Sequence, residues 1–191
     1  MISLKVPTSP AWTEVALANF DRFLLDHAAC ERKASATGMS FVVRYPDRTA
    51  LLEPMVAFAR EELEHFHQVL NLVLARGLTL PVADEKDPYV SALQRWVRGG
   101  RDARLLDRLV LGGVVEARGC ERFGMVRDAL PDGELRDFYA ELTRCEARHA
   151  GLFLRLARHY FSPDEIDARL QDLLEVEGAL VPGLELRGTL H

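Results

Sequence analysis

Cysteine is scarce in this sequence, and long apolar runs are missing. The chain has three cysteines in 191 residues and none in a C-x-x-C pair, a usage that is typical of reduced thiols and argues against a rubredoxin-type iron centre or a zinc ribbon. No apolar run approaches the ~20 residues that span a bilayer, and residues 1–10 lack the apolar core of a secretory signal. We therefore expect a cytoplasmic protein with no membrane partner.

A surplus of basic residues is also missing. The chain has 24 lysines and arginines against 29 acidic residues, a net charge of −5, and this balance does not indicate a nucleic-acid binder. The distribution is uneven, however, because five arginines stand against two aspartates between residues 95 and 108. This segment is either a local basic surface or the result of a general preference for arginine over lysine.

Helical patterns cover most of the chain, and no strand pattern extends beyond a few residues. Ser9-Pro10 is a typical helix start, Gly38 is a typical helix end, and Ser162 to Glu165 form a capping box. Residues 40–46 are predicted to connect the first two long helices. The predicted helices span residues 11–36, 47–76, 89–97, 102–130, 134–160 and 163–177. The predicted class is all-α.

Loop lengths predict how these helices pack. Short connections join the first two long helices and the last two, whereas a long crossover at about residues 78–101 separates the two pairs. This order is typical of a ferritin-like four-helix bundle. A chain of 191 residues fits a single domain, with the bundle at about residues 10–160 and a fifth helix and tail at about residues 163–191.

The strongest functional signal is a repeated pattern, in which one helix carries a glutamate and the next carries Glu-x-x-His. The two copies are Glu31 with Glu62 and His65, and Glu116 with Glu146 and His149. The first glutamate precedes its tetrad by 31 residues in one copy and by 30 in the other. Four glutamates and two histidines in this order are the ligand set of a dinuclear iron or manganese carboxylate site inside a four-helix bundle.

Helical facing separates these four glutamates from the other acidic residues. Each of the four shares its helix face with small or apolar side chains, and Glu62, for example, lies on a stripe with Phe58 and Phe66. Glu64 and His67 also form a Glu-x-x-His tetrad, but their helix face is polar, and we reject that pair as ligands.

Metal ions explain how four carboxylates can share one core. Burying an unpaired carboxylate costs roughly several kcal/mol, and two divalent irons would balance four negative charges. Oxygen ligands with some imidazole favour iron or manganese over zinc or copper(I). The alternative is that each buried glutamate pairs with an arginine, and the nearby candidates are Arg32, Arg118, Arg122 and Arg148.

The sequence offers two candidates for the ligand on the third long helix. Cys120-Glu121-Arg122 repeats the string Cys30-Glu31-Arg32, yet Glu121 has a mixed helix face whereas Glu116 has an apolar one. The two side chains are about 140° apart around the helix, so only one can point inward. We predict Glu116 as the ligand and a salt bridge for Glu121.

Other residues near the predicted ligands have two interpretations each. Gly112, Gly113 and Gly119 lie around Glu116 and serve either a substrate pocket or close helix packing. His27 and Tyr139 either orient the ligands by hydrogen bonding or are ordinary core residues.

Four segments resemble the tRNA 2-methylthio-isopentenyladenosine hydroxylases (MiaE), and the likeness covers about residues 10–160. The segments are Ala29-Cys30-Glu31-Arg32-Lys33-Ala34, Glu61-Glu62-Leu63-Glu64-His65-Phe66, Glu116-Ala117-Arg118-Gly119-Cys120-Glu121-Arg122-Phe123 and Cys145-Glu146-Ala147-Arg148-His149. The Glu/Glu-x-x-His scheme is shared by ferritin-like diiron proteins in general, whereas the Glu-Ala-Arg-x-Cys-Glu-Arg-Phe string is more specific.

The resemblance implies a nonhaem diiron monooxygenase that hydroxylates the isopentenyl group of a modified adenosine beside the anticodon of tRNA. Its cofactors would be two iron ions, with O2 as co-substrate. The chain has no flavin, nicotinamide or iron–sulfur motif, so a separate reductase or electron-transfer protein would supply two electrons. The candidates for tRNA contact are Arg95, Trp96, Arg98, Arg101 and Arg104, unless these residues form a solvated face with Trp96 packed inside.

Three other functions are compatible with the pattern. They are a ferroxidase or iron-handling role, hydroxylation of another substrate such as a quinone, and a metal-free helical interaction protein. The metal-free protein would tolerate Glu62→Ala, which separates it from the others. The sequence leaves the oligomeric state open.

Overall fold

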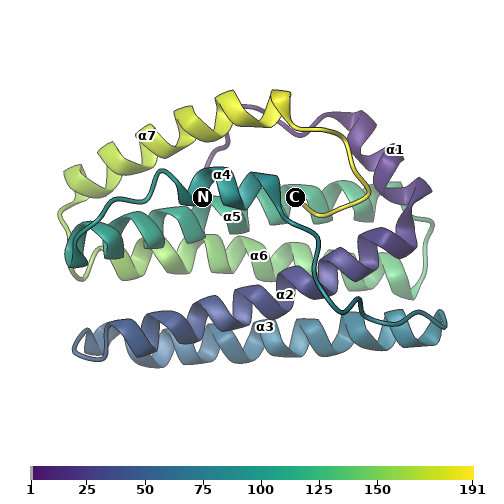
Figure 1. Ribbon diagram of the computed structural model, residues 1–191, viewed down its shortest axis with the longest axis horizontal. Coiled ribbons are helices and arrows are strands. Elements are labelled where there is room, and N and C mark those ends of the chain that lie inside the picture. Colours follow the sequence, from purple (N-terminus) through teal and green to yellow (C-terminus); the bar gives the residue numbers. More distant parts are fainter. Residues whose placement is uncertain (1) are drawn as a thin grey trace. The chain divides into compact units, whose positions relative to one another are not determined.

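The chain is built from helices, as its periodicity predicts. The computed structural model describes residues 2–191, and this part contains seven α-helices, one short 3-10 helix and no strand (Figure 1). In chain order they are α1 (Pro10–Ala18), α2 (Phe20–Arg44), α3 (Thr49–Ala75), α4 (Pro88–Gln94), α5 (Arg101–Ala129), α6 (Glu134–Ala157), α7 (Pro163–Leu180) and η1 (Val181–Gly183). None of the described helices is both long and apolar enough to cross a membrane.

The chain divides into two compact units, each built on one antiparallel helix pair. The α2–α3 unit comprises residues 14–85 and 187–190. The α5–α6 unit comprises residues 2–13, 86–186 and 191, and in it α4 and α7 also pack on α5. Each unit therefore contains one copy of the repeated glutamate pattern.

Gly38 allows α2 and α3 to pack closely. A Cβ atom at this position would lie 2.8 Å from Cδ1 of Phe58 and 3.1 Å from Cβ of Ala59, closer than side chains tolerate. The predicted helix end at Gly38 is therefore wrong: α2 continues to Arg44, and residues 40–44 are helical. The glycine is there because two helices meet, and the first break in the predicted helix instead falls at Asn19, between α1 and α2.

Two of the three glycines around Glu116 serve the packing of α5. A Cβ at Gly112 would lie 2.7 Å from the ring of Phe153 on α6, and one at Gly113 would lie 3.0 Å from Ile2 and 3.3 Å from the carbonyl oxygen of Ala150. Close packing is thus the role of these two positions. Gly119 differs, because it is buried and yet a Cβ there would meet nothing within 4 Å.

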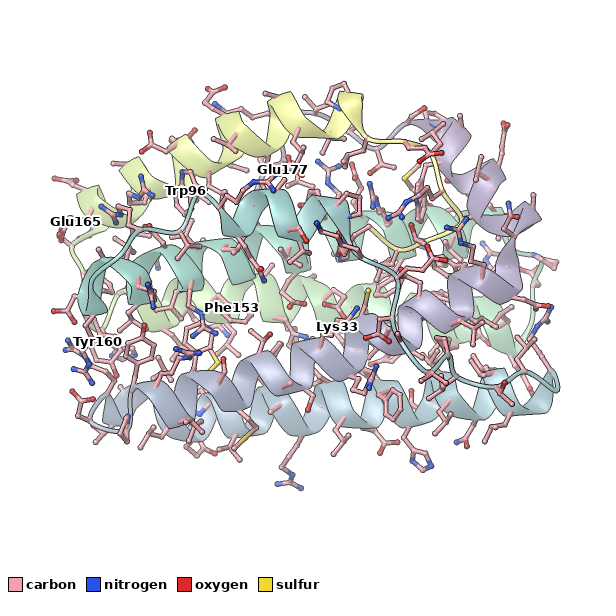
Figure 2. The ribbon with its side chains drawn as sticks, viewed as in Figure 1. Lys33, Trp96, Phe153, Tyr160, Glu165 and Glu177 are labelled. Carbon is pink, nitrogen blue, oxygen red and sulfur yellow. The ribbon has the colours of Figure 1, made fainter. Side chains whose placement is uncertain are left out.

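A buried ion pair fastens α7 and the N-terminal segment to α5. Glu177 on α7 accepts hydrogen bonds at Oε1 from Nε and Nη2 of Arg118, at 2.9 and 2.6 Å, and both side chains are fully buried (Figure 2). Arg118 also donates to the carbonyl oxygen of Val6 at 2.9 Å and to Oγ1 of Thr8 at 3.0 Å. The hydroxyl of Tyr89 on α4 donates to Glu177 at 3.1 Å. At the start of α7, Ser162 and Glu165 form the predicted capping box.

Candidate metal centre

The α2–α3 unit brings Glu31, Glu62 and His65 together. Glu31 comes from α2 and the other two from one face of α3, and all three are at most 5% exposed. One ligand atom from each lies within 4.8 Å of the others. Nδ1 of His65 is 3.5 Å from Oε2 of Glu62 and 3.8 Å from Oε2 of Glu31. The i, i+3 spacing on α3 and the packing of α2 thus converge on one cluster.

His27 holds the carboxylate of Glu31 from the preceding turn of α2. Its Nε2 atom is 2.7 Å from Oε1 of Glu31, and the imidazole is fully buried. A hydrogen bond to one carboxylate oxygen restrains the rotation of the whole group. His27 is thus placed to restrain Glu31, and its role in orienting a metal ligand stays a prediction.

The charges in this cluster favour a cation. Burial raises the pKa of Glu31, but hydrogen bonds with His27 and His65 outweigh it and lower that pKa to about 2. Burial lowers the pKa of His65, but its two carboxylate neighbours, Glu31 and Glu62, raise that pKa to about 12. The metal-free cluster therefore retains a proton on His65, and a metal ion would take the place of that positive charge.

The α5–α6 unit repeats the arrangement with Glu116, Glu146 and His149. All three are buried, at 9%, 4% and 3% exposure, and one ligand atom from each lies within 4.8 Å of the others. Nδ1 of His149 is 3.7 Å from Oε2 of Glu146 on its own helix and 3.9 Å from Oε2 of Glu116 on α5. Both units thus place one imidazole against one carboxylate from each helix of the pair.

Glu121 lies outside this cluster and makes the predicted salt bridge. Its carboxylate pairs with Arg118 and accepts hydrogen bonds from the hydroxyl of Thr8 at 2.6 Å and from the amide of Thr8 at 3.2 Å. Arg118 and Glu121 therefore belong to the contacts that fasten the N-terminal segment. The structure places Glu116, and not Glu121, beside Glu146.

Nearby arginines have partners other than the predicted ligands. Arg32 donates to Asp84 at 2.8 Å, Arg118 pairs with Glu177, and the guanidinium of Arg122 lies 5.1 Å from the centre of the Trp12 ring. Most of the arginines that could have neutralised the buried glutamates are thus engaged elsewhere, which weakens the metal-free interpretation.

Burial and contacts also describe the rejected pair Glu64 and His67 and the candidate Tyr139. Glu64 and His67 are exposed, as their polar helix face predicts. Tyr139 is fully buried, and its ring packs 5.7 Å from the ring of Phe123 and 5.2 Å from that of Phe138. These contacts are those of a core aromatic residue, so an orienting role for Tyr139 stays a prediction.

The basic segment at residues 95–108 is partly used inside the α5–α6 unit. Nε and Nη2 of Arg98 donate to the buried carboxylate of Asp107 at 2.9 and 2.8 Å, and Arg169 on α7 binds the same aspartate. The guanidinium of Arg169 also covers one face of the Trp96 ring, 3.8 Å from its centre. A base that stacked on this face of Trp96 would have to displace Arg169.

The other predicted RNA contacts in that segment, Arg95, Arg101 and Arg104, are exposed. For them tRNA contact stays a prediction, whereas Arg98 and Trp96 have structural contacts that explain their presence without RNA.

Comparisons with known proteins agree with the site. A family model described as tRNA-(MS[2]IO[6]A)-hydroxylase (MiaE) matches residues 2–191. The tRNA 2-(methylsulfanyl)-N(6)-isopentenyladenosine(37) hydroxylase of Pseudomonas putida (strain KT2440) is 43% identical over 189 residues, covering 96% of this chain and 90% of that protein. The protein of the same name from Salmonella typhimurium (strain LT2) is 31% identical over 235 residues, covering 96% of this chain and 86% of that protein.

A solved structure shows the same fold. The protein named "Protein 43 with aldehyde deformylating oxygenase activity from Synechococcus" matches with a TM-score of 0.93 and 37% identity, covering 100% of this chain and 96% of that chain. The likeness confirms the predicted all-α, ferritin-like fold. The match over residues 2–191, the two curated relatives and the two buried Glu/Glu-x-x-His clusters lead to one conclusion: the chain belongs to the MiaE family.

Proposed function

We propose that this protein hydroxylates the isopentenyl side chain of 2-methylthio-isopentenyladenosine in tRNA. One observation carries the proposal: a chain that belongs to the MiaE family also assembles both Glu/Glu-x-x-His clusters as buried groups of carboxylates around an imidazole. The curated relatives are named for this reaction. The reaction converts a C–H bond to C–OH, and it consumes O2, two electrons and two protons with release of one water.

The two clusters together would hold two iron ions. The proposed ligands are Glu31, Glu62, His65, Glu116, Glu146 and His149. Their donor set fits, because carboxylate oxygens with imidazole nitrogens suit iron, and four carboxylates balance two divalent ions. The ferritin-like fold supports the pairing of the clusters, since such bundles build dinuclear sites from one glutamate on each of two helices and Glu-x-x-His on each of the other two. When bound, the irons would activate O2 for insertion into a C–H bond.

The chain itself would hold the ligands and keep water out. His27 fixes the carboxylate of Glu31. Buried Phe58, Leu142 and Phe153 supply apolar surface. An apolar surface excludes water and so limits side reactions of the activated oxygen. Gly119 leaves room next to Glu116, because no atom lies within 4 Å of the place where its Cβ would be. We assign that room to the isopentenyl group.

The same proposal accounts for the electron supply and the location. The sequence has no motif for a flavin, nicotinamide or iron–sulfur group. A separate reductase or electron-transfer protein would therefore deliver the two electrons. Because the substrate is a tRNA nucleoside, we place the protein in the cytoplasm.

Nucleoside mass spectrometry tests this function directly. A bacterial host that makes 2-methylthio-isopentenyladenosine but lacks a hydroxylase would express this chain, and its tRNA would be digested and compared with that of the same host expressing the Glu62→Ala variant. We expect a gain of one oxygen atom on that nucleoside with the wild-type chain alone. The purified wild-type protein is assayed for iron in parallel, and an iron-loaded protein that adds no oxygen, even with a reductase supplied, would contradict the proposal.

An aldehyde is the competing substrate that one comparison favours. The solved relative at 37% identity is named for aldehyde deformylating oxygenase activity. The same purified protein is therefore given an aldehyde with the same electron supply. Turnover of the aldehyde without turnover of the tRNA nucleoside would select the second function.

A further inference from the structure

We infer that four arginines, three on the outer face of α6 and one at its C-cap, form the surface on which the tRNA backbone docks. This arginine stripe consists of Arg144, Arg148, Arg155 and Arg158, and all four side chains are exposed. The inference rests on the proposed function, because it names the surface that would bring the tRNA to the protein. It concerns residues outside the segment 95–108 that the sequence pattern singled out.

The spacing of these residues makes a continuous stripe. At 100° per residue they fall within an arc of about 80°, and from the first to the last they extend about 21 Å along the helix. Gly151 occupies the gap in the middle of the stripe, and a terminal nitrogen of Arg155 lies 2.9 Å from the place where a Cβ of Gly151 would be. The guanidinium of Arg155 thus lies back over Gly151 and fills the interval toward Arg148.

The stripe is on the opposite side of α6 from Glu146 and His149. Both ligands are buried, at 4% and 3% exposure, and their direction is about 170° from that of the stripe. The arginines therefore cannot serve the metal centre, and their contact would be with the outside of the RNA and not with the reacting nucleoside.

Little negative charge opposes the stripe. Between residues 142 and 163 the chain has a single acidic residue, the buried Glu146. Glu141 pairs with Arg144 and marks the stripe's beginning. Arg155 and Arg158 form no ion pair within residues 2–191. A stabilising interaction with the carbonyl end of α6 could account for Arg155 and Arg158, whereas Arg144 pairs with Glu141 and Arg148 donates to Sγ of Cys145 at 3.1 Å.

The exposed surface of α7 has the opposite charge. Its exposed acidic residues are Asp164, Glu165, Asp167, Asp172 and Glu175, and its single basic residue, Arg169, is bound to Asp107 and Asp172. A polyanion approaching the α5–α6 unit would be repelled by α7 and attracted to α6. A chain with a net charge of −5 can bind RNA only through such a local surface.

The arginine stripe ends at the same end of the α5–α6 pair as the exposed part of the basic segment. Because α5 and α6 are antiparallel, with Gly112 against Phe153, the last turn of α6 lies level with about residues 108–111 of α5, and the first turns of α5 extend beyond it. Arg101 and Arg104 therefore belong to the same end of the helix pair as Arg155 and Arg158. In Figure 2, the label of Phe153 marks the last turns of α6 at this end. The charges of Arg101 and Arg104 would add to those of the stripe along an extended phosphate backbone.

A salt titration of tRNA binding tests this surface. The probe is tRNA isolated from a host that makes 2-methylthio-isopentenyladenosine, and the variants are Arg155→Glu with Arg158→Glu and the milder Arg155→Gln with Arg158→Gln. We expect the charge reversal to weaken binding by at least about tenfold. Loss of two phosphate contacts should lower the slope of log Kd against log salt by about 1.4–1.8 in the glutamine variant.

The matched control reverses two arginines at the other end of the same helix pair. Arg127→Glu with Arg136→Glu changes the net charge equally, at side chains that pair with Asp128 and Asp132. Its affinity should stay within about twofold of the wild type. Equal weakening by both reversals would show an effect of net charge alone and would overturn the inference, as would wild-type affinity in the Arg155/Arg158 variants.

Two further results separate this inference from the proposed function. A wild-type protein that binds tRNA through the stripe but hydroxylates no nucleoside would support the surface and refute the hydroxylase function. Arg155/Arg158 variants that bind tRNA normally but accept electrons slowly from a reduced ferredoxin would overturn the inference, because the stripe would then be the docking site of the electron donor. Iron content and the unfolding temperature of each variant confirm that the fold is intact.

Discussion

His65 shows at the scale of one residue how the charge of the site is balanced. In the metal-free cluster its imidazole lies between the carboxylates of Glu31 and Glu62, and these carboxylates raise its pKa, against the effect of burial, to about 12. A metal ion bound as we propose would therefore compete with this proton for the same position. This competition makes the stability of the metal-free protein depend on pH.

We expect the metal-free protein to lose stability as the pH rises above 6.5, the ordinary pKa of His65. The folded state retains the proton on His65 up to a pKa of about 12, so the contribution is complete below 6.5 and declines between 6.5 and 12. The lowered pKa of Glu31 acts at the other end, where stability is lost as the pH falls from 4.5 toward about 2.

Thermal unfolding in the presence of a chelator measures this dependence. The unfolding temperature should fall between pH 6.5 and 9, and His65→Gln should flatten the curve in that range. An unchanged unfolding temperature of the wild-type protein across this interval would show that His65 does not hold a proton. Iron loading should remove most of the alkaline loss, because the metal takes the place of the proton.

The two overlapping Glu-x-x-His tetrads on α3 provide matched substitutions. Glu62 and His65 are buried, whereas Glu64 and His67 are exposed on the same helix. We expect Glu62→Gln or His65→Ala to reduce iron binding and hydroxylation by at least about 100-fold. Glu64→Gln and His67→Ala should leave both within about twofold. Iron content per chain and the rate of oxygen addition to the nucleoside distinguish the two sets, and equal losses in both would remove the ligand assignment.

At the scale of the helix, Gly38 sets the distance between α2 and α3, although its sequence context resembles a helix end. Gly38 lies inside α2, where Phe58 and Ala59 of α3 approach it. The energetic cost of glycine in a helix interior, about 0.5–1 kcal/mol relative to alanine, is offset by the closer packing. Ser35 adds a hydrogen bond from its hydroxyl to the carbonyl oxygen of Ala59 at 2.7 Å.

We expect Gly38→Ala to destabilise the protein by about 1–3 kcal/mol, because the added methyl group would lie 2.8 Å from Phe58. The matched control is Gly124→Ala on α5, where the nearest atom to an added Cβ is 3.7 Å away. That change should be neutral or stabilising by up to about 1 kcal/mol. Denaturant unfolding measures both, and a Gly38→Ala variant as stable as Gly124→Ala would show that α2 and α3 are not in close contact at this point.

At the scale of the whole molecule, the family-specific string on α5 joins separate parts of the chain. Within the Glu-Ala-Arg-x-Cys-Glu-Arg-Phe string, Glu116 belongs to the metal cluster, while Arg118 and Glu121 bind the N-terminal segment, and Arg118 also binds α7. One helix segment thus carries the proposed metal ligand on one face and closes the α5–α6 unit on another. Because Arg118 and Glu121 have this second, structural role, the family-specific string extends beyond Glu116.

We expect a substitution of Arg118 or Glu177 alone to lower the stability of the folded protein. Both side chains are fully buried. Removing Glu177 leaves Arg118 with Glu121 as its remaining carboxylate partner, and breaking a buried pair costs about 3–5 kcal/mol. We expect Glu177→Leu to lower the unfolding temperature by about 6–20 °C. Arg118→Met with Glu177→Leu should recover part of that loss, because no buried charge is left. A double variant whose loss equals the sum of the single losses would show that the two groups do not interact.

The sequence by itself determined the class of fold and brought out the six residues that we propose as metal ligands. Helical periodicity and loop lengths predict the long helices to within a few residues at most ends, and the facing of Glu31, Glu62, Glu116 and Glu146 selects them from 29 acidic residues. Such local patterns suffice because an apolar face must be buried whatever it packs against, and a carboxylate on that face needs a cation.

Only the tertiary structure decided the roles of residues whose contacts come from distant segments of the chain. Gly38 signals a helix end in sequence and becomes a point of close packing once Phe58 lies against it. Trp96 resembles an RNA-stacking residue until Arg169, 73 positions later, covers its ring. Periodicity reports which face of a helix is apolar but not what approaches it, and so the partners of a glycine, a tryptophan or an arginine are fixed only when the helices have packed.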